Sequence, residues 1–391
     1  MLGITNKISS MQYIVLFIAS VLIPSFIAWV FGDGVAFLIH YWLFILFGYL
    51  TIKTNMKFMY VLFGYFLVSV FFFHSATLGE RTFFSVNFLF TSACLYGLNK
   101  LDIDLERFNI RHIFINFFLF LFCYIISINV SGQTYDGRVY YDGFIIAHHY
   151  AYVAAFFGYF LILQQKTWIG IAVVLSGALV GTRSGLLVCA IPFIHLAKQY
   201  FNQSAGSKIQ KAVLLSVICI IGLGATFFLF QKQITPTINT FKTLSVESIV
   251  ENDEEELSDF SASRTILWAL MFTQVEEDGF TLPNITGRGP ASSKDFLEEN
   301  FNARLWMHND FLDIFFCWGA LGVGIYIFCI CCYYRQTKDI YFLLMLLIAT
   351  LTNGFFPYIA IQFVALHLLA IKINKKQGIS MSNVENNINI I

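Results

Sequence analysis

The sequence predicts an all-α polytopic membrane protein with about twelve transmembrane helices and one large extracytoplasmic loop that contains an interfacial helix. Three observations predict this fold: the composition, the spacing of the apolar runs, and the distribution of lysine and arginine. Of 391 residues, 58% are hydrophobic and only 12% are charged, whereas a soluble domain carries about 25% charged residues. The mean hydropathy of +0.70 is too high for a chain that hides its apolar residues in one water-soluble core, so much of its surface must face lipid.

Twelve apolar runs are candidates for membrane spans. A spanning helix needs about 20 mostly apolar residues, and fewer where neighbouring helices shield its ends. The runs cover residues 12–31, 35–52, 58–74, 82–98, 112–130, 144–163, 167–182, 185–201, 212–230, 311–334, 340–354 and 356–372. The first run lacks a small-x-small cleavage site and exceeds the apolar core of a signal peptide, so we interpret it as an uncleaved span.

Lysine and arginine predict the orientation, because they collect in cytoplasmic connections. With the N-terminus placed in the cytoplasm, every cytoplasmic connection holds a basic residue. They are Lys7, Lys53, Lys57, Lys100, Arg107, Arg111, Lys166, Lys198, Lys208, Lys211, Arg335, Lys338, Lys372, Lys375 and Lys376. The short external loops hold only Arg81, Arg138 and Arg183. Both termini are therefore expected in the cytoplasm and the large loop outside.

This orientation divides the chain into four parts. Residues 1–231 form an N-terminal bundle of nine spans, and residues 232–309 form the large external loop. Residues 310–373 hold the last three spans, and residues 374–391 form a cytoplasmic tail.

The large loop contains an acidic run and a predicted helix. Residues 245–259 are rich in Asp and Glu; we interpret them as a solvated segment, with a divalent-ion site as the alternative. Ser263 is a favoured helix N-cap before Arg264. The apolar residues Ile266, Leu267, Leu270, Met271 and Val275 then fall on one side, a pattern typical of a helix in the membrane interface. The Pro- and Gly-containing segments 282–284 and 287–290 are expected to form turns.

Two arginines at the external face are candidates for binding an anion. Arg183 stands between two apolar runs, where an unpaired charge is expensive, so it is either functional or a snorkelling residue that marks a helix end. Arg264 begins the predicted interfacial helix, where free N–H groups and the helix dipole attract anions. Its planar guanidinium suits phosphate oxygens, and the alternative is a structural pair with Asp259.

His308 is the candidate base, because an imidazole can accept a proton from a sugar hydroxyl near neutral pH. It lies where the loop re-enters the bilayer, and Asp310 and Asp313 are near enough in sequence to orient it. A lone histidine at an interface is more often structural, so the residue type alone does not decide its role.

Other residue patterns argue for neither a metal nor a nucleic acid. The eight cysteines lie inside apolar runs and have no zinc-ligand spacing, and Asp102-Ile103-Asp104 has no domain around it to bind a nucleotide. We therefore expect no metal and no cofactor. The formal net charge of zero favours no nucleic-acid partner.

The external residues form an ordered series of motifs. The series runs Arg183, Arg264…Trp268, Gly287-x-Gly289, His308-Asn309-Asp310-Phe311-Leu312 and Trp318-Gly319-Ala320-Leu321-Gly322. It resembles the bacterial O-antigen ligase and polymerase superfamily of polytopic membrane glycosyltransferases. The motif block covers roughly residues 264–322, and the predicted spans and loop agree with the family over nearly the whole chain. Before the sixth span, Gly143…His148-His149 departs from the Gly…Pro-Asn pattern that members often carry.

The resemblance implies an enzyme outside the inner membrane that acts on a polyprenyl-pyrophosphate-linked oligosaccharide by inverting glycosyl transfer. Arg183 and Arg264 are then expected to bind the pyrophosphate, and His308 to activate or position the acceptor hydroxyl. The external segments 135–142 and 276–306 offer aromatic rings, arginines and carboxylates suited to sugars. The residues expected to bind substrate are Arg138, His149, Arg288, Arg304 and Asn309. Membrane lipid and a protein that regulates chain length are the other expected partners.

Several activities remain open from the sequence. A polymerase transfers the growing glycan to a lipid-linked repeat unit, whereas a ligase transfers the finished glycan to lipid A-core; we favour the polymerase because polymerases are more numerous. A lipid-linked-oligosaccharide flippase is a further alternative, although the chain shows no matching halves. A fourth class uses a polyprenyl-monophosphate sugar and an acid in the first external loop. Here that loop offers only Asp33.

Overall fold

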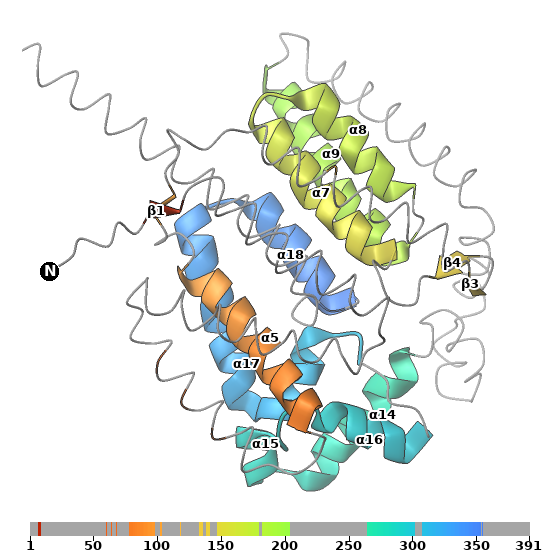
Figure 1. The fold of residues 1–391 in the computed structure, drawn as a ribbon, viewed down its shortest axis with the longest axis vertical. Helices are drawn as coiled ribbons and strands as arrows, with labels where there is room; N and C mark the ends of the chain where they lie inside the picture. The colour runs from red at the N-terminus through yellow and green to blue at the C-terminus, as the bar shows by residue number, and fades with distance from the viewer. Residues whose placement is uncertain are drawn as a thin grey trace, which may run out of the picture.

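The computed structural model is predominantly helical in the part of the chain that it describes (Figure 1). The described residues are 7–8, 60, 64, 68, 78–97, 102–103, 118, 133–135, 138–140, 147–179, 182–203, 264–301, 307–352 and 354. The helices are α5 (Leu78–Gly97), α7 (Ala147–Leu163), α8 (Thr167–Ala178), α9 (Arg183–Gln203), α14 (Arg264–Asp278), α15 (Leu282–Thr286), α16 (Ser292–Phe301), α17 (Asp310–Thr337) and α18 (Ile340–Thr352).

The predicted spans that fall on described residues are helices. Six of the twelve, beginning at residues 82, 144, 167, 185, 311 and 340, coincide with α5, α7, α8, α9, α17 and α18. Two stretches, Ser184–Phe201 and Asp310–Arg335, are long and apolar enough to cross a membrane, and α7, α8 and α18 contain shorter apolar stretches. The other six predicted spans, the acidic run and the cytoplasmic tail lie outside the described residues, apart from isolated positions.

Two short ladders were not predicted. β1 (Lys7–Ile8) pairs in parallel with β2 (Asp102–Ile103), and this pairing joins two segments that the sequence places on the cytoplasmic side. β3 (Gln133–Tyr135) and β4 (Arg138–Tyr140) form an antiparallel ladder within a predicted external loop, with Tyr135 opposite Arg138.

Helices α7 and α8 pack closely because small residues face each other. A Cβ added to Gly158 of α7 would lie 2.7 Å from the carbonyl oxygen of Gly170 in α8, and one added to Gly177 would lie 2.8 Å from the Cβ of Ala154. Such small residues allow the close helix contacts that are frequent in membrane proteins. Residues 150–162 of α7 are all buried, which is the pattern of a helix surrounded by other helices.

A polar cluster connects α7, α9 and α18 at one end of these helices. Asp339, just before α18, accepts hydrogen bonds at 3.0 and 3.2 Å from the hydroxyl of Tyr159 in α7. It also accepts one at 3.1 Å from the backbone N–H of Phe342, which caps α18. The ring of His195 in α9 lies 5.2 Å from Tyr159 and 4.8 Å from Tyr341. The C-terminal parts of α7 and α9 therefore meet the beginning of α18.

Helix α17 is two helical segments with a break at Gly319, where φ is 64° and ψ is −166°. The first segment folds back on the second: the hydroxyl of Tyr326 donates to Asp310 at 3.3 Å, and the rings of Phe311 and Tyr326 lie 5.7 Å apart. The predicted span over 311–334 is therefore helical on both sides of Gly319 but interrupted at this residue. Residues 320–337 continue beyond the break for about 27 Å, at 1.5 Å per residue.

The Gly287–Gly289 loop packs directly into this break. The backbone N–H groups of Arg288 and Gly289 donate to the carbonyls of Phe316 and Cys317 at 3.1 and 3.0 Å. In an unbroken helix those carbonyls would accept from residues four positions later. The loop therefore satisfies backbone groups that the break would otherwise leave unpaired inside the protein.

Both glycines at this contact have conformations that only glycine adopts readily. Gly287 has φ 87° and ψ 173°, and Gly319 lies in the same region, which other residues almost never occupy. A Cβ on Gly287 would lie 2.1 Å from the carbonyl oxygen of Cys317, and a Cβ on Gly319 would lie 2.4 Å from the carbonyl of Ile285. Neither position can accept a side chain without separating the loop from the helix.

Helices α14, α15 and α16 gather around the beginning of α17 (Figure 1). α16 also reaches α5, because Lys294 forms an ion pair with Glu80 at 3.9 Å and lies 5.9 Å from the ring of Phe84. One turn further along the same face, α5 packs against α17 through Phe88, whose ring lies 4.7 Å from Trp318. Helices α5, α16 and α17 therefore form one packed unit.

We predict that Gly319→Ala lowers the free energy of unfolding by about 2–4 kcal/mol, because a Cβ adds backbone strain and a clash with Ile285. Gly324→Ala is the matched control: Gly324 lies in the same helix, and its added Cβ meets nothing within 4 Å. That control should change the stability by no more than about 1 kcal/mol. Thermal unfolding of the purified protein in detergent measures both variants, and equal melting temperatures would contradict the prediction.

Candidate functional site

His308 lies between α16 and α17 in the chain, and its backbone is in the left-handed region with φ 55°. This conformation is unfavourable for a residue with a Cβ and persists only where the surroundings hold it. Such strained positions concentrate at functional sites. The histidine that the sequence predicts to be catalytic is therefore also a point of local backbone strain.

Asn309 fixes the chain immediately after His308 by capping α17. Its side-chain oxygen accepts from the backbone N–H groups of Phe311 at 3.0 Å and Leu312 at 3.3 Å. Its carbonyl accepts from the backbone N–H of Asp313 at 3.0 Å. The residue was predicted to bind substrate, and the structure uses its oxygen in a helix N-cap.

Trp268 fixes the chain immediately before His308. Its indole N–H donates to the carbonyl of Met307 at 2.8 Å. The same part of α14 contributes to an apolar cluster whose buried members are Leu267, Met271, Leu297, Met307 and Phe316. Arg264 is the first residue of α14, one helical turn before Trp268. The helix predicted to begin at Arg264 is thus present, and its N-terminal turns lie close to the segment that carries His308.

Two buried carboxylates occupy the first turn of α17. Asp313 is 1% exposed and accepts a hydrogen bond at 2.8 Å from the hydroxyl of Ser293 in α16. The backbone N–H of Met307 interacts favourably with the same carboxylate. Asp310 is fully buried and accepts from Tyr326. The positive end of the helix dipole faces both groups and favours their charged form.

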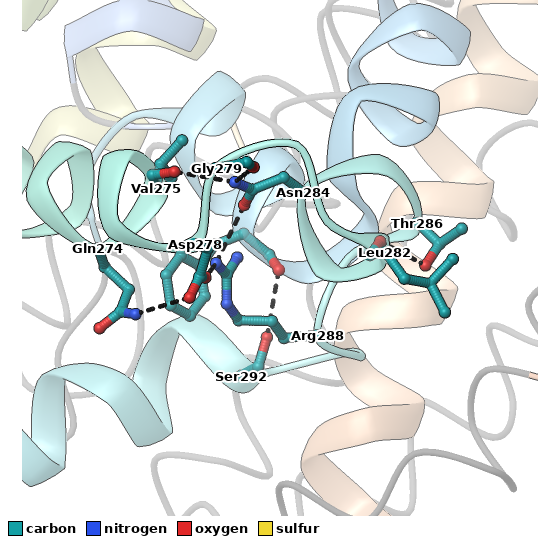
Figure 2. A network of polar contacts seen from close by, with 10 residues as sticks. Gln274, Val275, Asp278, Gly279, Leu282, Asn284, Thr286, Arg288 and Ser292 are labelled. Carbon is teal, nitrogen blue, oxygen red and sulfur yellow. Dashed lines mark hydrogen bonds and ion pairs between the residues drawn. The ribbon is translucent and has the colours of Figure 1, made fainter.

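Arg288, a predicted substrate-binding residue, lies within a polar network of the loop (Figure 2). Its guanidinium pairs with Asp278, donates to the side-chain oxygen of Asn284 at 3.0 Å, and stacks 4.2 Å from the ring centre of Phe316. Asn284 in turn donates to the carbonyls of Val275 and Gly279 at 2.9 and 2.7 Å. These contacts join α14, α15 and α17 around the Gly287–Gly289 loop.

Arg183 and the beginning of α17 lie at the same end of the described helices. Arg183 is the first residue of α9, and the C-terminal part of α9 meets the beginning of α18 through His195 and Tyr341. The beginning of α17 folds back past its break, so Asp310 contacts Tyr326, and Tyr326 interacts with Thr350 near the end of α18. The beginnings of α9 and α17 therefore both lie toward the end of α18 opposite Tyr341, where Gly185 of α9 also approaches Ala151 of α7.

The other predicted substrate-binding residues fall in different places. Arg138 begins β4, and His149 lies in the first turn of α7. Arg304 lies outside the described residues. The beginning of α7 is at the same end as Arg183, because α7 also ends at the polar cluster beside Asp339.

Three residues of the site were not assigned a role by the sequence: Trp268, Ser293 and Asp278. Trp268 occurs in the motif series, but an indole in an apolar helix is most simply explained by packing. Asp278 precedes its partner Arg288 by ten residues, a separation that no helical pairing rule covers. Ser293 was inconspicuous because α16 was not predicted.

Comparison of the chain with models of known protein families and with curated proteins finds no match.

We predict that Arg288→Ala lowers the free energy of unfolding by about 1–2 kcal/mol, because it removes a partly buried ion pair and a ring contact. Asp278→Asn should give a similar loss. The double variant should be less destabilised than the sum of the two, because each single change already removes the shared bond. Thermal unfolding of the four proteins measures this coupling. An Arg288→Ala variant that keeps full stability but loses activity would instead assign Arg288 to substrate.

Proposed function

We propose that this protein is a membrane glycosyltransferase that polymerises a surface polysaccharide outside the bacterial inner membrane. In this proposal the chain has twelve spans, with both termini in the cytoplasm and the large loop in the periplasm. The donor is a glycan linked to polyprenyl pyrophosphate, and the acceptor is a lipid-linked repeat unit. His308, Arg264 and Arg183 are the catalytic residues.

The observation that supports this best is the hydrogen bond from Trp268 to the carbonyl of Met307. It brings the N-terminal turns of α14, which begin at Arg264, beside the segment of His308. Phosphate groups favour a helix N-terminus that also carries an arginine. A general base and an anion-binding position thus come from segments about forty residues apart.

The placement of Arg183 adds a second cationic position at the same end of the molecule. The N-terminus of α17 is a less suitable site for the pyrophosphate, because Asn309 already accepts from its first free N–H groups. In this proposal, arginines balance the charge of the leaving group. The exposed apolar residues of α9, such as Leu187 and Ile194, leave a flank beside Arg183 that suits a polyprenyl chain.

The proposed reaction is a displacement at the anomeric carbon of the donor glycan. His308 accepts the proton of the acceptor hydroxyl as that oxygen forms a bond to the anomeric carbon. The bond from this carbon to the pyrophosphate oxygen breaks, and polyprenyl pyrophosphate leaves with its electron pair. Arg183 and Arg264 stabilise the negative charge that develops on the leaving oxygen. The configuration at the anomeric carbon is inverted.

A polymerase and a ligase differ in the acceptor of the glycan. The surface glycan of a deletion strain shows which of the two activities is lost. A surface with single repeat units on the lipid core is the expected result and corresponds to a lost polymerase. A bare core with lipid-linked polymer in the membrane would identify the protein as a ligase. Loss of all surface glycan, with single lipid-linked units retained on the cytoplasmic side, would instead favour a flippase.

We predict that Arg183→Ala, Arg264→Ala and His308→Ala each lower polymer formation at least about 100-fold, the order expected when a base or an oxyanion-stabilising group is lost. Arg335→Ala is the matched control, because Arg335 is an exposed arginine in the last turn of α17, far from His308. Polymer is measured by gel analysis of surface glycan, with the amount of protein in the membrane checked for each variant.

Full-length polymer in normal amount from the His308 and Arg264 variants would overturn the proposed mechanism. The same loss in Arg335→Ala would show that the assay responds to any change of charge.

We predict that activity persists in EDTA, because two guanidinium groups balance the pyrophosphate charge in the proposed mechanism. The measurement is polymer formation by the purified protein with lipid-linked substrate, with and without chelator. Loss of activity on chelation and its recovery with Mg²⁺ would show that a metal shares this role.

A further inference from the structure

We infer that Trp268 is a positioning residue for His308, acting through its hydrogen bond to the Met307 carbonyl. The expected changes in rate rest on the proposed function, whereas the effect of the hydrogen bond on the backbone of His308 does not. The indole N–H donates at 2.8 Å to the carbonyl of the residue that directly precedes His308.

This bond acts on the backbone angle that makes His308 unusual. The angle φ of His308 describes rotation between its own Cα and the peptide group that contains the Met307 carbonyl. A partner that holds that carbonyl therefore holds φ, which is 55° here. Loss of this partner removes the direct restraint on the peptide group, so that His308 can shift toward the negative φ that residues with a Cβ prefer.

The same peptide segment is held from a second side by Asp313. The backbone N–H of Met307 interacts with the Asp313 carboxylate, which Ser293 of α16 also contacts through its hydroxyl at 2.8 Å. Met307 is fully buried in the apolar cluster with Leu267 and Met271 of α14. Three elements, α14, α16 and α17, thus fix the residue before the histidine.

The chain after His308 is fixed as well, because Asn309 caps α17. Both neighbours of the histidine are therefore immobilised, and the direction in which its imidazole leaves the backbone is set by φ. A displacement of about 1 Å at a reacting group can lower a rate by about 100-fold. Loss of the indole N–H should consequently change turnover more than substrate binding.

The first test is Trp268→Phe, which keeps an aromatic ring in the cluster and removes only the donor and part of the ring. We expect kcat to fall about 10- to 100-fold while KM for the lipid-linked donor changes less than about 3-fold. Trp168→Phe is the matched control, since Trp168 is 84% exposed on α8. Leu297→Ala controls for packing, because it loosens the same cluster without touching the Met307 carbonyl.

Combination with His308→Ala separates positioning from general damage. In that background Trp268→Phe should cause no further fall in the residual rate, because there is no imidazole to position. An equal fall in both backgrounds would overturn the inference. So would a loss in Leu297→Ala as large as that in Trp268→Phe, at matched thermal stability.

A readout without turnover keeps the inference testable if the proposed reaction is wrong. Acylation of His308 by diethylpyrocarbonate, followed by mass spectrometry of its peptide, reports how the imidazole is presented. We expect Trp268→Phe to change this rate at least about 3-fold and Trp168→Phe to leave it unchanged. An unchanged rate in Trp268→Phe would refute positioning, whereas full activity of His308→Ala alone would refute only the proposed function.

Discussion

The contact between Gly287 and Gly319 is the constraint on which the rest of the described site depends. Each glycine occupies a backbone region closed to other residues, and each leaves room only for the backbone of the other segment. The break at Gly319 exposes carbonyls of α17, and the loop N–H groups satisfy them. The external loop and the broken helix therefore stabilise each other, and neither conformation is favourable alone.

This constraint determines where His308 lies. Because α17 turns back at Gly319, its first segment is short and packs under α14 and α16 instead of running on through the bundle. Met307, shortly before that segment, then lies in the apolar cluster formed with α14, α16 and α17, where Trp268 and Asp313 contact its backbone. A straight α17 would leave its N-terminus, and the histidine before it, without these partners.

Hydropathy was sufficient to predict the described helices of the bundle but not the break. Residues on both sides of Gly319 are apolar, and glycine is common in membrane helices. The apolar run over 311–334 therefore predicts one span. The β3–β4 ladder had a usable signal, since Asp136-Gly137 between alternating residues favours a two-residue hairpin connection. The roles of Arg288 and Asn309 were missed for another reason: their partners follow from loop packing and capping, whereas the sequence shows only that both are polar and external.

The way negative charge is distributed around His308 limits what the site can bind. Asp310 and Asp313 are buried beneath it and are each neutralised in part by hydrogen bonds and by the helix dipole. Asn309 already accepts from the first free N–H groups of α17, so this helix end is less available to an anion than the beginnings of α14 and α9. Under the proposed function, the pyrophosphate would then approach His308 from the side of α14 or α9, where each helix begins with an arginine. Base and leaving group would lie on different sides of the reacting carbon, as an in-line displacement with inversion requires.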